Sequence, residues 1–406
     1  MSSHIAVVGA SLAGLRAAEQ LRAAGHPGRI TVYGEEPHPP YNRPPLSKEL
    51  LGGDSADNAE ALHARVAFRR RASVADVDFR LGTRVEQADL GSGTLHLADG
   101  SGASFDGLVA ATGLRPRRLA APGPRAGRHV LRTLEHCVAL RDELTPGTSV
   151  VVVGGGFIGC EVAATALGRG CAVTVVEPTG APMNRVLGPA LAAAVQRHHE
   201  QAGIRFVTGP SVAAFDGRER VTGVHLTDGS ALGADVVVES VGSVCNTEWL
   251  AGNPGIDRTD GVLTDNNLAV AGAERAVAVG DLARFPNPLF DDVPRRVEHW
   301  SIPTDTARRA ATTLVAELVG EAPDAQPFAP IPSFWSDQLD LRLQSFGSPA
   351  LADEVVVDEG DLDDLGHGLL ATYYRDGRHV GSVAVNLPPA RQRALREAFL
   401  SLPSPA

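Results

Sequence analysis

The stretch Ser149-Val-Val-Val-Val-Gly-Gly-Gly-Phe-Ile-Gly159 decides the fold of this 406-residue chain. Its four valines predict a buried strand, the glycines that follow predict a tight turn, and the residues beyond them predict a helix. A second strand, Ala172–Val176, ends at Glu177, 18 residues after the last glycine. A strand, a glycine-rich turn, a helix and a second strand that ends in an acid together form a dinucleotide-binding fingerprint.

Each position of this fingerprint has a physical task. The first glycine allows the tight turn, the second lets the backbone approach a pyrophosphate, and the third lets the helix pack closely on the strand. The free N–H groups at the helix N-terminus then face the phosphates. Glu177 can accept hydrogen bonds from both ribose hydroxyls and would repel a 2′-phosphate, so it indicates NAD rather than NADP. The contacts predicted for NAD are Gly154, Gly156, Phe157, Ile158, Gly159 and Glu177.

The same unit occurs near the N-terminus. The turn Gly9-Ala-Ser-Leu-Ala-Gly14 follows a short apolar strand, and a helix is predicted over Leu15–Ala24 before the next strand. Ser11 stands where the fingerprint has its middle glycine, so this match is the weaker of the two. Glu35 follows the second strand as the ribose acid, with Glu36 as the alternative. The contacts predicted from this unit are Gly9, Ser11, Leu12, Ala13, Gly14 and Glu35.

Two dinucleotide sites in one chain indicate hydride transfer between NADH and a flavin. A further duplication supports two similar lobes, because hairpins with the turns Asp99-Gly100 and Asp228-Gly229 precede the buried strands Leu108–Ala111 and Val236–Val238. We therefore predict an α/β fold with two Rossmann-like nucleotide-binding domains, followed after a proline-rich linker by a small α+β domain. The predicted division is 1–114 and 244–322 for an FAD-binding domain, 115–243 for an NAD-binding domain and 323–406 for the C-terminal domain.

The composition narrows the class of protein. A formal net charge of −11 argues against nucleic acid or an anionic membrane surface as a partner. The sequence has no apolar run near 18 residues and no basic, then apolar, leader, so we expect neither a transmembrane helix nor a targeting segment. The four cysteines form no C-x-x-C pair and no metal-ligand pattern, so we expect no metal site and a reducing, cytoplasmic location.

A motif after the first unit makes the sequence similar to a known family. Tyr41-Asn-Arg-Pro-Pro-Leu-Ser-Lys48 resembles a motif of the FAD-dependent NADH:ferredoxin reductases of monooxygenase and dioxygenase systems. The resemblance covers nearly the whole chain. Its further marks are Ala111–Arg117, Leu131–Thr133, Gly154–Ala163, Val279–Phe285, Arg296–Trp300 and Phe334–Gln338. It implies a glutathione-reductase-like arrangement, FAD and NADH as cofactors, and an iron–sulfur ferredoxin as partner.

The resemblance also implies roles for single residues. Lys48 would lie near the reactive edge of the flavin, and Glu161 near the nicotinamide, where it could pair with Lys48; these two are the predicted catalytic residues. Asp281 would bind the ribityl chain, and Trp300 would lie on the pyrimidine side of the flavin. The cofactor-binding positions that accompany them are Arg43, Lys48, Val85, Ala111, Thr112, Gly113, Arg132, Arg185, Gly242, Gly280, Asp281, His299, Trp300 and Trp335.

Lys48 is also singled out by composition. Of 37 arginine and lysine residues it is the only lysine. The sequence therefore uses arginine at every other basic position and keeps lysine here. A compact ammonium is not interchangeable with a planar guanidinium. Its positive charge would stabilise the anion that develops at N1 or N5 of the flavin during reduction.

The expected function is transfer of electrons from NADH through FAD to a [2Fe–2S]-type ferredoxin that serves a cytochrome P450 or a Rieske oxygenase. Two alternatives stay open: an NADH-sensing interaction protein of the apoptosis-inducing-factor type, and a reductase of another one-electron acceptor such as rubredoxin. A disulfide reductase is disfavoured because the first cysteine is Cys137, far from the first fingerprint. Either a monomer or a homodimer is expected. A basic patch for the ferredoxin is predicted at Arg43, Arg295, Arg296 and Arg342.

Overall fold

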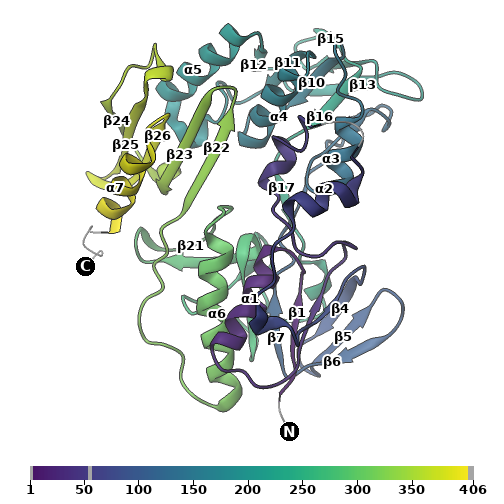
Figure 1. The fold of residues 1–406 in the computed structure, drawn as a ribbon, viewed down its shortest axis with the longest axis vertical. Helices are drawn as coiled ribbons and strands as arrows, with labels where there is room; N and C mark the ends of the chain where they lie inside the picture. Colours follow the sequence, from purple (N-terminus) through teal and green to yellow (C-terminus); the bar gives the residue numbers. More distant parts are fainter. Residues whose placement is uncertain (1–2, 54–56, 401–406) are drawn as a thin grey trace.

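The computed structural model describes residues 3–53 and 57–400. Two lobes lie one above the other in Figure 1, and a C-terminal domain lies beside the upper lobe. The lower lobe is built from two separate parts of the chain, because α1 near the N-terminus packs against α6, which follows the upper lobe in the sequence. This arrangement brings both fingerprints and the C-terminal domain towards the middle of the molecule.

The first lobe is a five-stranded parallel sheet with the order β19-β7-β1-β2-β3. Its central strands are buried throughout, as expected when helices cover a parallel sheet. Helix α1 begins at Leu12, three residues before the predicted start, because the backbone turns helical directly after the extended N-cap residue Ser11. The bounds are β1 Ile5–Val8, α1 Leu12–Ala23, β2 Ile30–Tyr33, β3 Asp78–Arg80, β7 Gly107–Ala110, β19 Ala276–Ala278 and α6 Ile302–Val319.

Two three-stranded sheets complete this lobe, one antiparallel and one mixed. The first contains the predicted Asp99-Gly100 hairpin, which is confirmed. The second has one strand before β19 and two strands after it, and it leads back to α6. Their strands are β4 Val85–Asp89, β5 Thr94–Leu97, β6 Gly102–Ser104, β18 Val262–Leu263, β20 Ala283–Asn287 and β21 Asp291–Arg296.

The second lobe repeats the design with the parallel order β12-β11-β10-β16-β9 and its own hairpin sheet. Its core continues into the first part of the chain, because Tyr41, Leu46 and Leu62 belong to the same apolar cluster as Val150 and Val152. The bounds are α2 Ala59–Val66, β9 Arg128–His129, α3 Leu134–Arg141, β10 Ser149–Val153, α4 Phe157–Gly168, β11 Ala172–Glu177, α5 Asn184–Ala202, β12 Arg205–Thr208, β13 Val212–Asp216, β14 Gly223–Leu226, β15 Ala231–Gly233 and β16 Val236–Glu239.

The chain crosses between the lobes twice, and the two crossings pair with each other. Strand β8 (Leu114–Pro116) runs antiparallel to β17 (Ser243–Cys245). Thr112 and Asn246 reinforce the pairing, because the Thr112 hydroxyl donates to the Asn246 carbonyl and the Asn246 amide donates to the Thr112 carbonyl, at 2.6 and 3.0 Å. The domain boundaries predicted at 114/115 and 243/244 fall within this pair, and that division stays a proposal.

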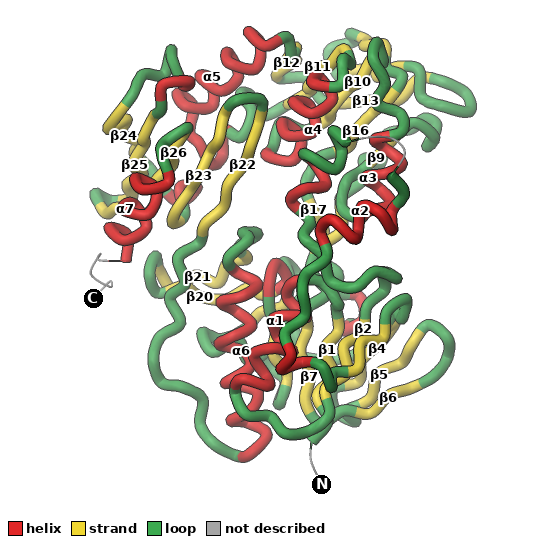
Figure 2. The backbone as a smooth tube through the Cα atoms, in the orientation of Figure 1, coloured by secondary structure: helices red, strands yellow, loops and turns green. Residues whose placement is uncertain are grey.

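The C-terminal domain is an antiparallel sheet with the order β22-β23-β26-β25-β24 and one helix. A long loop after α6 leads into it, as Figure 2 shows, and the predicted prolines lie on this loop. Sequence reasoning predicted its last three strands and its helix, but not β22 and β23. The bounds are β22 Ser333–Gln338, β23 Leu341–Gly347, β24 Glu354–Glu359, β25 Leu369–Arg375, β26 Arg378–Val385 and α7 Pro389–Leu400.

Candidate functional site

The outer glycines of both fingerprints are required by the backbone. A Cβ atom on Gly14 would lie 1.8 Å from the carbonyl oxygen of Gly9, and one on Gly159 would lie 2.0 Å from that of Gly154. These distances are far below van der Waals contact, so no other residue fits without moving the strand or the helix. Around the middle glycine of the second turn, Gly156, a Cβ would meet nothing within 4 Å. That side of the turn is where a pyrophosphate can approach the N-terminus of α4.

The predicted ribityl-binding segment packs on the first fingerprint. Gly280 adopts a φ of +69°, and a Cβ there would lie 2.9 Å from the Cβ of Ala13. Its neighbour Asp281 lies 3.6 Å from the guanidinium of Arg132. Removal from water raises the pKa of Asp281, although Arg132 opposes this effect. The segment therefore brings a carboxylate and a guanidinium, both predicted FAD contacts, close to the start of α1.

The two candidate ribose acids of the first lobe differ in their surroundings. Glu35 is exposed, and its carboxylate lies 3.4 Å from Arg84 in a solvent-facing ion pair. Glu36 instead accepts hydrogen bonds from Arg43 and Tyr41, at 2.5 and 2.6 Å. Glu36 therefore balances the charge of Arg43, whereas Glu35 faces solvent, from which a ribose can approach. Glu35 is therefore the better candidate of the two.

Arg43 forms several hydrogen bonds within the first lobe. Besides Glu36 its side chain donates to the carbonyl oxygen of Arg132 at 2.5 Å, to Tyr41 Oη at 2.9 Å and to Ser11 Oγ at 3.3 Å. The guanidinium thus joins the loop after β2 to the N-cap of α1 and to the segment before α3. It can hold the first fingerprint in shape, which fits its predicted place beside the cofactor.

In the second lobe the acid at the end of β11 is held by its own turn. The carboxylate of Glu177 accepts hydrogen bonds from the Gly155 N–H at 2.7 Å and from Thr179, through its N–H at 2.9 Å and its hydroxyl at 2.6 Å. These donors fix the carboxylate directly beside the glycine-rich turn. Both its position and its charge suit recognition of a ribose with a free 2′-OH.

The predicted catalytic pair is formed. Lys48 Nζ lies 2.7 Å from Glu161 Oε2, and the Lys48 side chain is 15% exposed while that of Glu161 is 6% exposed. Ser47 Oγ donates to the same carboxylate oxygen at 2.5 Å. Ser336 Oγ, from β22, donates to Glu161 Oε1 at 2.6 Å. One buried carboxylate on α4 therefore joins the first lobe, the second lobe and the C-terminal domain.

A cluster of aromatic side chains joins the first lobe to the C-terminal domain. The rings of Trp300 and Trp335 meet edge to face with centroids 5.8 Å apart, and Phe68 lies 6.0 Å from Trp300. His299 meets Phe334 at 5.0 Å, and loss of water contact lowers its pKa to about 4. These residues come from both the first lobe and the C-terminal domain.

Two polar atoms in this segment fit a cofactor with hydrogen-bonding edges. His299 Nδ1 and Ser301 Oγ are buried, and neither has a hydrogen-bond partner within the described residues. Buried polar atoms are normally paired, so an unpaired neighbouring couple beside the aromatic rings suits the polar edge of a flavin. The residues present therefore fit FAD.

The remaining predicted contacts lie around these groups and stay predictions. Val85 and Ala111 are buried in the first lobe, while Thr112, Gly113 and Gly242 lie at the crossing between the lobes. Ile158 is 48% exposed on the first turn of α4, and Arg185 is exposed on the first turn of α5. Within residues 3–53 and 57–400, no group of three or more His, Cys, Asp or Glu side chains could hold a metal ion.

Comparisons with known proteins agree with this geometry. Residues 3–307 match the family described as pyridine nucleotide-disulphide oxidoreductase, and residues 333–400 match a reductase C-terminal domain. The chain belongs to the pyridine nucleotide-disulphide oxidoreductase family. The probable ferredoxin reductase CtmF of Castellaniella defragrans is 36% identical to it, over 98% of this chain and 95% of that relative.

Two further members of the family are similar over their whole length. The ferredoxin–NAD(+) reductase component of the biphenyl dioxygenase system of Paraburkholderia xenovorans is 35% identical, over 95% of this chain and 90% of that relative. The crystal structure of a covalent putidaredoxin reductase–putidaredoxin complex superposes with a TM-score of 0.87 at 31% identity, over 99% of this chain and 94% of that one. The predicted family, fold class and oxidoreductase activity are confirmed, and FAD and NADH are the cofactors of such reductases.

The family name refers to disulfides, but the cysteines of this chain do not form a redox pair. All four are free, and Cys137, Cys160 and Cys171 are buried. Burial raises the pKa of Cys137 to about 11, so it is a poor thiolate. Cys245 is half-buried, and burial raises its pKa as well. The electrons of this family member therefore have to leave by another route than a cysteine pair.

Sequence reasoning missed the polar residues around Glu161. Ser47 was quoted within the Tyr41–Lys48 motif, and Ser336 and Gln338 within Phe334–Gln338, but none was given a role. No local signal marks them: only when Phe334–Gln338 is known to be a strand does its two-residue period put Phe334, Ser336 and Gln338 on one face and Trp335 on the other. Polar residues on a face that also carries a phenylalanine indicate a buried polar group opposite them.

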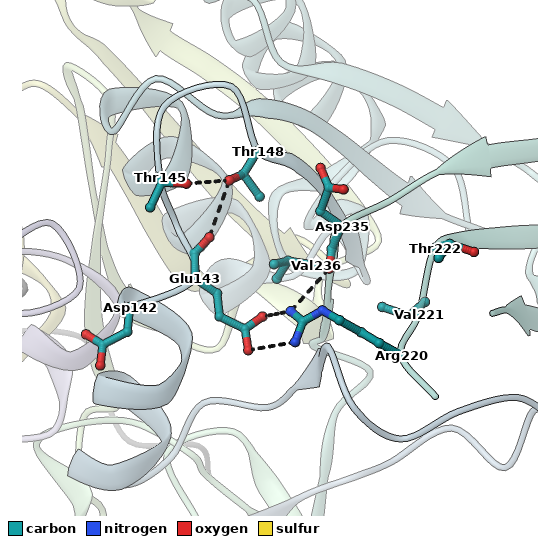
Figure 3. Close-up of a pocket in the computed structure, with 9 residues that line it drawn as sticks. All are labelled: Asp142, Glu143, Thr145, Thr148, Arg220, Val221, Thr222, Asp235 and Val236. Atoms are coloured by element: carbon teal, nitrogen blue, oxygen red, sulfur yellow. Dashed lines mark hydrogen bonds and ion pairs between the residues drawn. The ribbon is translucent and has the colours of Figure 1, made fainter. Parts of the chain in front are cut away.

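A separate pocket of about 460 Å³ lies on the second lobe, and Figure 3 shows its lining. Arg220 forms an ion pair with Glu143 across it. None of the predicted cofactor contacts or catalytic residues lines this pocket. It belongs to the junction of α3, β10 and β16 rather than to the candidate site.

Proposed function

We propose that this chain transfers electrons from NADH, through FAD, to a small ferredoxin of the [2Fe–2S] type that serves a cytochrome P450 or a Rieske oxygenase. The observation that carries the proposal is the buried Lys48–Glu161 ion pair, which joins the motif after the first fingerprint to the helix of the second fingerprint. When bound, FAD supplies the conversion of a two-electron donor into a one-electron donor. The likeness to ferredoxin reductases along the whole chain supports the nature of the acceptor.

The residues of the chain have distinct tasks in this function. The Gly154–Gly159 turn and Glu177 bind the NADH pyrophosphate and ribose, and the first turn with Glu35 binds the FAD. Lys48 contributes a positive charge where negative charge develops during reduction, and Glu161 balances that charge at rest. The half-buried rings of Trp300 and Trp335 contact each other and can pack against the flavin.

The basic patch predicted for the ferredoxin is not formed. Arg43 is mostly enclosed and engaged by Glu36, Arg295 pairs with Asp291 at 2.5 Å, and Arg296 pairs with Asp260 at 2.6 Å and with Glu298 at 2.8 Å. Arg342 lies 3.9 Å from Asp337. Since each guanidinium faces a carboxylate, the four residues present little net positive charge.

We propose the exposed pair Arg69 and Arg70 as the docking surface instead, since neither forms an ion pair within the described residues. It directly follows Phe68, whose ring lies beside Trp300. Changing Arg69 and Arg70 together to glutamate should slow ferredoxin reduction about tenfold at low salt, because electrostatic steering is lost. Reduction of the flavin by NADH should stay unchanged, and an unaltered ferredoxin rate would contradict this surface.

The proposed function is tested by two measurements on purified, FAD-loaded protein. The first is flavin bleaching after rapid anaerobic mixing with NADH. The second is NADH-driven cytochrome c reduction with and without a [2Fe–2S] ferredoxin, with a rubredoxin in parallel. Rapid bleaching and strong stimulation by the ferredoxin are expected. Stimulation by rubredoxin alone would identify a different acceptor, and slow bleaching with a long-lived charge-transfer complex would favour an NADH-sensing protein.

We also propose a cytoplasmic location. All four cysteines are free thiols, which is the state that reducing compartments maintain. No helix within the described residues is long and apolar enough to cross a membrane. Recovery of the protein from the periplasmic or extracellular fraction would contradict the proposal.

A further inference from the structure

Strand β22 presents different side chains to the two regions that it separates. Because side chains alternate along a strand, Phe334, Ser336 and Gln338 point to one side and Trp335 to the other. The first three meet the second lobe, where the Phe334 ring lies 4.6 Å from that of Phe157, Ser336 bonds Glu161 and Gln338 bonds Met183. The Phe334 ring also lies 5.0 Å from His299 of the first lobe. Trp335 meets Trp300 of the first lobe. The strand therefore contacts both halves of the candidate site at once.

Ser336 is aimed at the predicted catalytic carboxylate. Its hydroxyl donates to Glu161 Oε1, while the donors Lys48 and Ser47 occupy Oε2. Gln338 Nε2 donates to Ser336 Oγ at 2.9 Å. A hydroxyl has one proton, so the donation from Gln338 leaves Ser336 oriented with its own proton on Glu161.

This polar chain lies out of contact with water. Ser336 and Gln338 are 0% exposed, and Glu161 is 5% exposed. In such surroundings a hydrogen bond to a carboxylate is strong, and its loss leaves a charged oxygen without a partner. The side-chain amide of Gln338 also donates to the sulfur of Met183, at 3.3 Å, which lies before α5. These hydrogen bonds thus connect the residue before α5, through the C-terminal domain, to Glu161.

We propose that Ser336, oriented by Gln338, is a positioning residue of the hydride-transfer site. It fixes the Glu161 carboxylate so that this group holds the Lys48 ammonium in one place. The C-terminal domain then determines the geometry of a charge pair that the two nucleotide-binding lobes build. The effect of Ser336 on hydride transfer rests on the proposed function. Its effect on the position of the Lys48 ammonium does not.

The position of Lys48 can be read directly, because it is the only lysine of the chain. FAD-loaded protein is treated with an amine-acylating reagent, and labelling of the Lys48 peptide is followed by mass spectrometry. Ser336→Ala should speed this labelling about fivefold, because a loosened Glu161 releases the ammonium. Gln338→Ala should act in the same direction by about twofold, since Ser336 keeps its contact but loses its orientation.

Two variants serve as controls. Ser345→Ala removes an equally buried hydroxyl from the neighbouring strand, and within the described residues that hydroxyl has no hydrogen-bond partner. It should label like the unchanged protein. Ser336→Thr keeps the hydroxyl and should restore slow labelling. Equal labelling of Ser336→Ala and the unchanged protein overturns the proposal, as does equal acceleration by Ser345→Ala.

The second readout separates this inference from the proposed function. In rapid mixing with NADH, Ser336→Ala should lower the limiting rate of flavin reduction about tenfold, with the NADH dissociation constant changed less than about twofold. A change confined to the dissociation constant would contradict a positioning role. If the unchanged protein is not reduced by NADH while labelling responds as expected, the proposed function is wrong and the coupling of Ser336 to Lys48 stands.

Discussion

The two glycine-rich turns of this molecule have the same backbone and different surroundings. In the first, a Cβ on Gly9 would lie 2.2 Å from the carbonyl oxygen of Ala111, and in the second, a Cβ on Gly154 would lie 2.2 Å from that of Ser240. The clashes at the last glycines match as well. The outer positions are therefore dictated by strand and helix packing, which the two lobes share, and not by the ligand.

The differences begin at the middle position and at the acid. Ser11 carries a hydroxyl that accepts a hydrogen bond from Arg43, whereas Gly156 leaves its side of the turn open. Glu35 extends into solvent, whereas Glu177 is fixed by three hydrogen bonds from its own turn and loop. The first turn is held by Arg43, a residue outside the fingerprint. The second is held by the hydrogen bond between its own Gly155 N–H and the fingerprint acid Glu177. This difference suits a tightly kept cofactor in one lobe and an exchanging coenzyme in the other.

The seventh residue after the first glycine differs most. In the first lobe it is Arg16, which pairs with Glu19 on its own helix at 2.7 Å. In the second it is Glu161, which pairs with Lys48 from the other lobe. The same position on two equivalent helices therefore carries an ion pair within one helix in one case and the candidate reaction centre in the other.

The largest effect is expected from the last glycines. Gly14→Ala and Gly159→Ala should each cost about 3 kcal/mol of stability, because the added Cβ overlaps a carbonyl oxygen. Gly14→Ala should lose FAD, whereas Gly159→Ala should keep FAD and lose reduction by NADH. Flavin absorbance per protein and rapid mixing with NADH measure both. The control is Gly168→Ala in α4, where a Cβ meets nothing within 4 Å; damage from this change would undermine the steric argument.

The next largest effect is a difference in the rate of flavin reduction between variants of Glu161 and of Arg16, which occupy the same position after the first glycine. Glu161→Gln should slow flavin reduction about 100-fold, about 2.7 kcal/mol, because the Lys48 charge loses its counter-ion in a largely enclosed site. Arg16→Gln should stay within about twofold, since its partner Glu19 lies on the same helix and also faces Arg71 at 3.6 Å, away from the Lys48–Glu161 pair. The single-turnover rate of NADH oxidation measures both variants. Similar losses in the two would mean that the position, and not the ion pair, carries the effect.

A smaller effect distinguishes the two acids. Glu177→Gln should raise the KM for NADH about tenfold and narrow the preference over NADPH, because a neutral amide no longer repels a 2′-phosphate. Glu35→Gln should weaken FAD binding about tenfold and leave the coenzyme preference unchanged. Steady-state kinetics with both coenzymes and titration of the apoprotein with FAD provide the readouts. An unchanged NADH/NADPH ratio in Glu177→Gln would remove that residue from the coenzyme site.

The smallest effect is expected for Ser11→Gly, which makes the first turn resemble the second. The Arg43 contact that it removes is 3.3 Å long, and Arg43 keeps its other partners. The free energy of unfolding should change by less than about 1 kcal/mol, and FAD should remain bound. Thermal unfolding followed by flavin fluorescence measures this. Release of FAD on substitution would show that the serine hydroxyl itself holds the cofactor.

The two βαβ units could be predicted from the sequence because short-range rules specify them. Runs of valine and fixed glycine spacing leave little choice of local structure, so even the hairpins that follow were placed correctly. Strand β22 was not predicted, because its inward-facing Ser336 and Gln338 are polar although they are fully buried. A period that depends on apolar residues cannot detect a strand whose buried face forms a hydrogen-bond chain.

The candidate site was predicted in part for a similar reason. Lys48 and Glu161 followed from the resemblance, and the structure brings them together. The contact between Ser336 and Glu161 spans 175 positions in the chain, and no local pattern encodes it. The basic patch failed because the sequence does not reveal which carboxylate reaches a given guanidinium, as the contacts of Arg295 and Arg296 show.

The pairing of β8 with β17 has a consequence for engineering. It makes residues 117–242 an insertion whose ends leave the first lobe side by side, at Pro116 and Ser243. An inserted unit with adjacent ends can be exchanged as a block without stretching either connection. A transplanted second lobe would bring its own coenzyme preference. It would have to keep the core contacts with Tyr41, Leu46 and Leu62, and the helix after its glycine-rich turn would have to offer a carboxylate to both Lys48 and Ser336.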